Sequence, residues 1–145
     1  MAKEGTCSNC GRYTQVEGHH IILKSEIKAL IECELNIIPL CESCHRGTFG
    51  VHGKNGERLK NKLRLNFQNE MELLFLKKEF TREEIGQALQ IKENALNGLC
   101  KLIRQDKGMF ARDNIIIAIM GGQRIEEREV INEQSDFDYA TNRIS

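Results

Sequence analysis

Two matching cysteine pairs decide the fold. They read Cys7-Ser8-Asn9-Cys10 and Cys41-Glu42-Ser43-Cys44, and His45 follows the second pair directly. Two residues between cysteines let both thiolates reach one ion from a tight turn, and two such pairs complete a tetrahedron around Zn²⁺. Because each pair lies in polar, turn-like sequence, two unrelated pairs of core cysteines are disfavoured. The sequence therefore predicts a closed structural zinc site with the ligands Cys7, Cys10, Cys41 and Cys44.

The remaining two cysteines do not extend this pattern. Cys100 lies in Leu99-Cys100-Lys101-Leu102-Ile103, a predicted helix, where we expect it to pack against neighbouring apolar residues. Cys33 has no evident partner in the sequence. We assign no role to Cys33.

Size and composition favour one ordinary domain or two small ones. The chain has 145 residues, of which 40% are hydrophobic, and it contains no tryptophan. A hydrophobic core this small is stabilised further when a metal ion is bound. The beginning of the sequence lacks the apolar region of a signal peptide, and the longest apolar runs are too short to cross a bilayer. We expect a cytoplasmic protein with reduced cysteines and no membrane partner.

Charge is unevenly distributed although the formal net charge is zero. Residues 46–64 carry six Lys or Arg against one Glu, whereas residues 125–145 carry six Asp or Glu against two Arg. A basic stretch can dock on phosphates, and the alternative is an ordinary solvated helix face. The candidate DNA contacts in this stretch are Arg46, Lys54, Arg58, Lys60, Lys62 and Arg64.

Two predicted strands lie between the cysteine pairs. Residues 18–23 read Gly-His-His-Ile-Ile-Leu, and residues 36–40 read Asn-Ile-Ile-Pro-Leu. Successive side chains of a strand face opposite sides, so we expect the imidazoles of His19 and His20 to point in opposite directions.

The order C-x-x-C, H-H-I and then N-x-I-x-L-C-x-x-C-H resembles the HNH endonucleases, also called ββα-metal nucleases. The resemblance covers residues 7–53. It implies a small ββα core that holds one divalent cation, Mg²⁺ or another, against a scissile DNA phosphate. It also implies hydrolysis of the phosphodiester bond to a 5′-phosphate and a 3′-hydroxyl.

By position, the resemblance assigns a role to each motif residue. His20 matches the general base that deprotonates the attacking water, and an imidazole suits that task near neutral pH. His19 and His45 match the metal ligands. Asn36 matches the asparagine that braces the loop behind the hairpin and so orients the base.

His52 departs from the family pattern. Relatives often place a further histidine three or four residues after the position of His45, whereas here the separation is seven, with Gly47 and Gly50 between. Two turns of unbroken helix would align His45 and His52, but the glycines disfavour such a helix. His52 is therefore a third metal ligand, a phosphate contact or an exposed side chain.

The rest of the sequence is predicted to be helical. We expect one helix over residues 57–78 and a capping box at Thr81-Arg82-Glu83-Glu84. Apolar spacing over residues 85–99 indicates a helix-turn-helix, with Gln90 in the turn where Gly is common. A reading helix over 92–104 would expose Lys92, Asn94, Asn97, Lys101 and Arg104 to a DNA groove. The alternative is a helical bundle that packs on the nuclease or dimerises. A last helix spans residues 112–120.

The sequence thus predicts an α+β protein with a ββα-metal nuclease domain at residues 1–78, a helical unit at 79–124 and a flexible acidic tail at 125–145. We expect an endonuclease of a phage or mobile element, acting in a bacterial cytoplasm. One such centre cuts one strand, so double-strand cleavage would need a homodimer or two events. Other partners would be phage packaging or recombination proteins. The alternatives are a non-catalytic zinc-containing DNA-binding adaptor or regulator, and a nuclease that acts on RNA.

Overall fold

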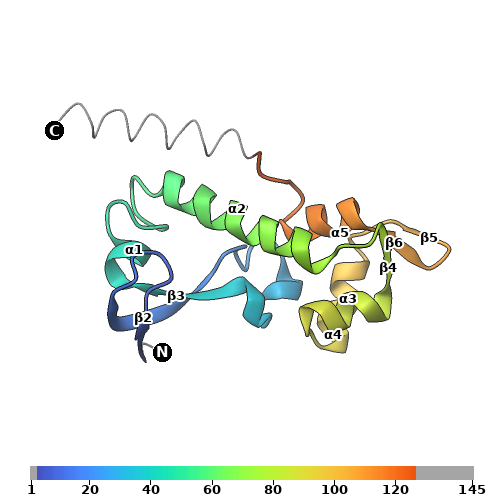
Figure 1. Ribbon diagram of the computed structural model, residues 1–145, viewed down its shortest axis with the longest axis horizontal. Coiled ribbons are helices and arrows are strands. Elements are labelled where there is room, and N and C mark those ends of the chain that lie inside the picture. The colour runs from blue at the N-terminus through green and yellow to red at the C-terminus, as the bar shows by residue number, and fades with distance from the viewer. Residues whose placement is uncertain (1–2, 127–145) are drawn as a thin grey trace.

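The computed structural model describes residues 3–126, which form a mixed helical and sheet structure (Figure 1). The structure has the small ββα-like core and the helical C-terminal part that the sequence predicts, and the two lie at opposite ends of the long axis. The acidic tail expected over 125–145 lies, beyond Glu126, outside the described residues. Within residues 3–126, no helix has the length and hydropathy needed to cross a membrane.

The first sheet is antiparallel, with the order β1-β2-β3. Its strands are β1 (Lys3–Thr6), β2 (Tyr13–His20) and β3 (Ile37–Cys41), and His19 pairs with Ile38. Strand β2 ends at His20 rather than continuing to residue 23 as predicted. The reason is that the Asn36 side chain, not a neighbouring strand, accepts the hydrogen bond of the Ile22 N–H at 2.8 Å. Two short 3₁₀ helices, Lys28–Leu30 and Glu34–Asn36, fill the connection to β3.

A short helix, a glycine-rich loop and a long helix follow the sheet. Helix α1 (Glu42–Arg46) begins directly after β3, and α2 (Glu57–Leu74) crosses the molecule lengthwise (Figure 1). The sequence predicts that the helix beginning at residue 57 extends to residue 78. It ends earlier because Phe75 leaves helical geometry and buries its ring completely in the core.

The C-terminal part combines helices with a second antiparallel sheet. Strand β4 (Glu79–Thr81) leads into α3 (Arg82–Leu89) and α4 (Glu93–Cys100), and α5 (Arg112–Ile119) comes last. The capping box is present, since the Thr81 hydroxyl accepts from the Glu84 N–H and the Glu84 carboxylate accepts from the Thr81 N–H. Strands β5 (Gln105–Asp106) and β6 (Met109–Ala111) were not predicted, and α4 ends at Cys100 instead of reaching residue 104.

Two clusters of buried side chains hold these elements together. The larger cluster joins the connection before β3 to α2, α3, α4 and α5, and includes Ile22, Leu30, Phe67, Ile85 and Ile115. The smaller cluster lies between the first sheet and α2 and includes Val16, Leu40 and Leu63. Cys33 is fully buried in the larger cluster, and Cys100 packs against the same cluster.

Candidate metal centres and active site

Four cysteine thiols converge beside the first sheet. Their sulfur atoms all lie within 4.8 Å of one another, and the Sγ atoms of Cys10 and Cys41 are 3.8 Å apart. In a regular tetrahedron with Zn–S bonds of about 2.3 Å, the sulfurs are separated by about 3.8 Å. Cys7, Cys10, Cys41 and Cys44 are therefore positioned to hold a zinc-type metal ion.

The thiols differ in how readily they ionise. Burial opposes ionisation of Cys7, but the backbone N–H groups of Cys10 and Cys41 outweigh it and lower the pKa of Cys7 to about 6. Burial and the neighbouring thiols raise the pKa of Cys44 to about 12. Four thiolates this close repel one another, so a divalent cation is what allows all of them to ionise together.

Three histidines form a second cluster, and each comes from a different segment. His19 is on β2, His45 is on α1, and His52 is in the loop that follows α1. Their ligand atoms lie within 4.8 Å of one another, and the ring centroids are separated by 4.8–5.2 Å. An arrangement of imidazoles around a common point is typical of sites for divalent cations.

His52 reaches this cluster through a folded-back loop, not through a continuous helix. Helix α1 ends at Arg46, and the backbone N–H of His52 then donates to the His45 carbonyl at 2.9 Å. The loop is so tightly wound that a Cβ atom added to Gly53 would lie 1.7 Å from the Gly47 carbonyl oxygen. Gly47 and Gly50, which disfavoured a helix in the sequence, allow the same close approach, since a Cβ on either would lie 2.5 or 2.6 Å from the Ser43 carbonyl oxygen.

His19 and His45 are buried, whereas His52 is exposed. Burial first, and then the neighbouring His45 and His52, lowers the pKa of His19 to about 4. Burial likewise lowers the pKa of His45. Neutral imidazole is the form that binds metal ions.

His45 also has an unsatisfied nitrogen. Within residues 3–126, its buried Nδ1 atom has no hydrogen-bond partner, and the nearest carboxylate oxygen, on Glu17, is 4.0 Å away. A buried nitrogen without a partner is costly, and metal coordination is one way to satisfy it. The three-histidine cluster therefore fits a divalent cation.

His20 lies outside this cluster, as the alternation of the strand predicts. Its Nε2 atom is 2.7 Å from the Ile31 carbonyl oxygen. A carbonyl only accepts, so Nε2 carries the proton and Nδ1 is left as the basic nitrogen.

Asn36 is fully buried behind the hairpin. Its side chain accepts from the Ile22 N–H and donates to the carbonyls of Ile22 and Leu30. The amide thus ties the end of β2 to the connection that carries Ile31.

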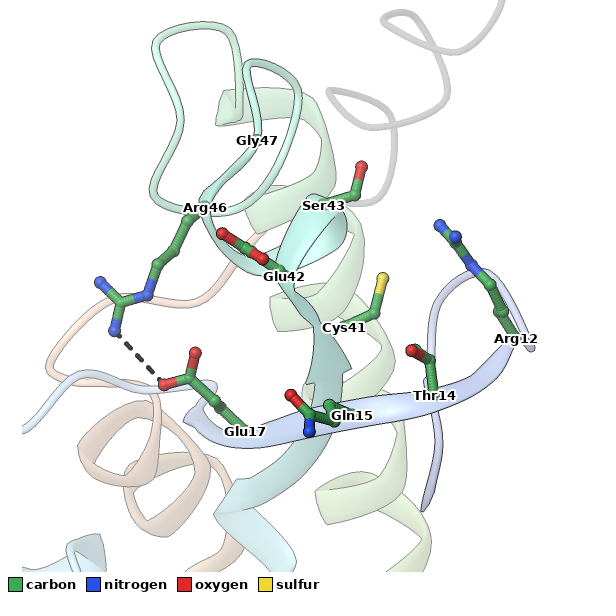
Figure 2. A pocket seen from close by; sticks show the side chains of 9 residues that line it. All are labelled: Arg12, Thr14, Gln15, Glu17, Cys41, Glu42, Ser43, Arg46 and Gly47. Carbon is green, nitrogen blue, oxygen red and sulfur yellow. Dashed lines mark ion pairs between the residues drawn. The ribbon is translucent and has the colours of Figure 1, made fainter. Parts of the chain in front are cut away.

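A hollow of about 580 Å³ lies between β2 and the start of α1 (Figure 2). Arg12 and Arg46 lie on opposite sides of it, and Arg46 is ion-paired with Glu17 at 3.5 Å. Sequence reasoning missed Arg12 and Glu17. The signal available for Glu17 was its place on the same face of the strand as His19, two residues away.

The basic residues expected to contact DNA differ in their surroundings. Arg46, Lys54 and Lys62 are exposed, whereas Arg58 and Lys60 are half-buried. Arg64 points inward, because its guanidinium donates to both Glu26 carboxylate oxygens at 2.8 and 3.0 Å and to the Met120 carbonyl. The candidates from the predicted reading helix are all exposed, namely Lys92, Asn94, Asn97, Lys101 and Arg104.

Residues 7–48 match the family model of the HNH endonucleases. The match includes the four cysteines together with His19, His20, Asn36 and His45, and it ends before His52. Comparison with curated proteins and with solved structures gave no match. The match to the HNH family model supports a nuclease-family assignment for residues 7–48, and the four cysteines of this segment are positioned to hold a metal ion.

Proposed function

We propose that this protein is a metal-dependent endonuclease that hydrolyses phosphodiester bonds in DNA. The observation that carries the proposal is the convergence of His19, His45 and His52 next to His20, within and directly after the HNH segment. The four-cysteine site is separate from this cluster, so the two metal sites have different tasks. The closed cysteine site stabilises the fold, and the histidine cluster serves the reaction.

His19, His45 and His52 would hold the catalytic cation. When bound, a divalent cation supplies charge neutralisation at the scissile phosphate and the departing 3′-oxygen. The low pKa of His19 keeps this imidazole available as a ligand throughout the neutral range. His45 would offer its unpartnered Nδ1 to the cation, and the Glu17 carboxylate, 4.0 Å from this atom, adds negative charge beside the site.

His20 would take the proton of the attacking water. The Ile31 carbonyl fixes which ring nitrogen is protonated, and Asn36 fixes the connection that carries this carbonyl. A positioned imidazole base contributes about 10²- to 10⁴-fold to a rate. The role of Asn36 is therefore to position the base.

DNA would be held by two sets of side chains. Near the histidine cluster these are Arg46, Lys54, Arg58, Lys60 and Lys62, and we leave out Arg64 because its guanidinium is bound within the protein. In the C-terminal part, α3 and α4 would act as a helix-turn-helix. A non-catalytic DNA-binding adaptor would not need a cluster of three imidazoles beside a positioned base.

Relaxation of supercoiled plasmid DNA tests the proposal. With added Mg²⁺ or Mn²⁺, the zinc-loaded wild type should nick the plasmid, and the His20→Ala variant should do so at least about 100-fold more slowly. The Lys78→Asn variant changes an exposed lysine outside both clusters and should nick at the wild-type rate. Zinc content and circular dichroism verify that each variant is folded.

A folded, zinc-loaded wild type that cuts neither plasmid nor single strands with any divalent cation would refute the proposal. Nicking by His20→Ala at the wild-type rate would refute the role of His20 alone. End-labelled products should carry a 5′-phosphate and a 3′-hydroxyl.

A further inference from the structure

The C-terminal part contains a β-hairpin that the sequence did not predict. Strands β5 and β6 flank a two-residue turn formed by Lys107 and Gly108, whose φ angles are 53° and 77°. Positive φ at both central residues is the requirement of a type I′ turn, the tight turn that matches the twist of a hairpin. We call Gln105–Ala111 the wing.

The wing completes an ordered series of helices and strands that begins at α2. A helix (α2) is followed by a strand (β4), two helices (α3 and α4), and the two strands of the wing, with the sheet order β4-β6-β5. In this order the returning strand β6 lies between β4 and β5, so the second sheet anchors the wing beside α3 and α4. This is the arrangement of a winged helix-turn-helix.

Helix α4 packs against the core with one face and exposes the opposite face to solvent. Leu96 and Leu99 are buried in the larger core cluster, and α4 lies against the 3₁₀ helix Lys28–Leu30. Its other face exposes Asn94, Asn97 and Lys101. This face is polar and exposed, and the Arg82 guanidinium of α3 donates to the Asn97 side chain on it.

The wing and α4 border a common hollow. Asn97 of α4 and Lys101, directly after α4, line it together with Gln105 and Gly108 of the wing. Figure 1 shows the wing extending beyond α3 and α4, at the end of the molecule opposite α1. A ligand that follows α4 would thus meet the wing next.

The charged side chains on and beside α4 and the wing indicate which class of ligand this surface would bind. Lys92, Lys101, Arg104 and Lys107 are exposed, and within residues 3–126 none of them forms an ion pair. Of the acidic residues on these elements and in the hollow, Glu93 is paired with Arg82, which leaves Asp106 on the wing and Glu83 on α3. Unpaired cations along a helix and a hairpin complement the regularly spaced phosphates of a nucleic acid.

We propose that the C-terminal part is a winged helix-turn-helix that binds duplex DNA, with α4 in the major groove. Lys107 of the wing and Arg104, the residue directly before the wing, would contact the flanking phosphate backbone. A B-form major groove admits a helix, whereas the narrow major groove of A-form RNA does not. The inference rests on the proposed function for its substrate, DNA, but it does not depend on the cleavage chemistry.

Duplex binding tests the inference without requiring catalysis. The full zinc-loaded chain is titrated into a fluorescently labelled mixed-sequence duplex of about three helical turns, in buffer without added divalent cation. Lys107→Asn removes the charge and keeps the turn, because Asn-Gly is the favoured type I′ pair. It should weaken binding roughly three- to tenfold at 0.1 M salt and lower the slope of log affinity against log salt by about 1. Arg104→Gln should do the same.

Lys78→Asn is the matched control. Lys78 is exposed and precedes β4, at the end of the second sheet away from the Lys107-Gly108 turn, so its loss should leave both affinity and salt slope unchanged. The inference is overturned if Lys78→Asn loses as much affinity as Lys107→Asn, if the wing variants bind like the wild type, or if they lose equal affinity for the single strand. It is also overturned if the chain binds no duplex at low salt.

The two proposals fail separately. Wild-type protein that nicks plasmid but binds duplex independently of the wing keeps the nuclease and removes the wing contact. Wing-dependent duplex binding without cleavage under any divalent cation would keep the wing contact and refute the nuclease proposal.

Discussion

His19 and His20 are adjacent on β2, and the strand gives them different surroundings. One imidazole enters the three-histidine cluster, and the other meets the Ile31 carbonyl. This separation follows from the alternation of side chains along a strand, so it could be predicted from the sequence. The Ile31 carbonyl could not be predicted, because it depends on how the connection between β2 and β3 folds.

At the same scale, Asn36 should matter for stability as much as for positioning. Asn36→Ala leaves two carbonyls and one N–H without their buried partner, so we expect a loss of about 2–3 kcal/mol in the free energy of unfolding. Urea denaturation of the zinc-loaded protein measures it. Asn66→Ala, at an exposed position on α2, should change the free energy by less than about 0.5 kcal/mol. Equal effects of the two substitutions would contradict the bracing role.

Among the elements, the loop between α1 and α2 is the one that completes the histidine cluster. Gly53→Ala places a Cβ against the Gly47 carbonyl, so the loop must open and His52 must move. We expect Mn²⁺ affinity to fall by at least about tenfold in calorimetric titration of zinc-loaded protein.

Gly98→Ala is the control for this loop prediction, because a Cβ at Gly98 on α4 meets nothing within 4 Å. It should leave Mn²⁺ affinity unchanged and increase stability by up to about 1 kcal/mol. Unchanged metal affinity in Gly53→Ala would show that the loop does not position His52.

Arg64 links three elements, since it joins α2 to Glu26 and to the end of α5. Partial burial opposes ionisation of Glu26, but the Arg64 guanidinium outweighs it and lowers the pKa of Glu26 below its ordinary value of 4.5. The pair therefore stabilises the folded state above about pH 4.5, and this stabilisation is lost as the pH falls through the lowered pKa.

Glu26→Gln should accordingly cost at most about 1 kcal/mol in the free energy of unfolding at pH 7. The difference from the wild type should shrink towards pH 3. Denaturation of both proteins across this range measures it. A difference that stays constant down to pH 3 would mean that the ion pair contributes nothing.

For the whole molecule, the larger core cluster connects parts that the sequence divides at about residue 78. Ile22 and Leu30 from the first part pack in the same cluster as Ile85 and Ile115 from the second. We therefore expect one cooperative transition when the zinc-loaded protein is unfolded in a calorimeter. Two separated transitions would show that the parts are independent domains.

Features that depend on short sequence patterns could be predicted, whereas features that depend on contacts between distant residues could not. The cysteine pairs and the Thr81 capping box are each encoded within a few residues, and the HNH motif is a fixed order of such short patterns, so all three could be predicted. The place of His52 depends on a folded-back loop, and the inward turn of Arg64 depends on Glu26 and Met120, which lie far away in the sequence. The wing was missed because its strands are only two and three residues long.

The most direct test of the account is the rate of plasmid nicking as a function of Mn²⁺ concentration, for zinc-loaded wild type, His52→Ala and His20→Ala. We expect His52→Ala to need more Mn²⁺ than the wild type to reach half its maximal rate. His20→Ala should keep the wild-type Mn²⁺ dependence and lose about 10²- to 10⁴-fold in the maximal rate. If His52→Ala responds to Mn²⁺ like the wild type and His20→Ala nicks at the wild-type rate, neither the three-histidine cluster nor His20 has the role assigned to it.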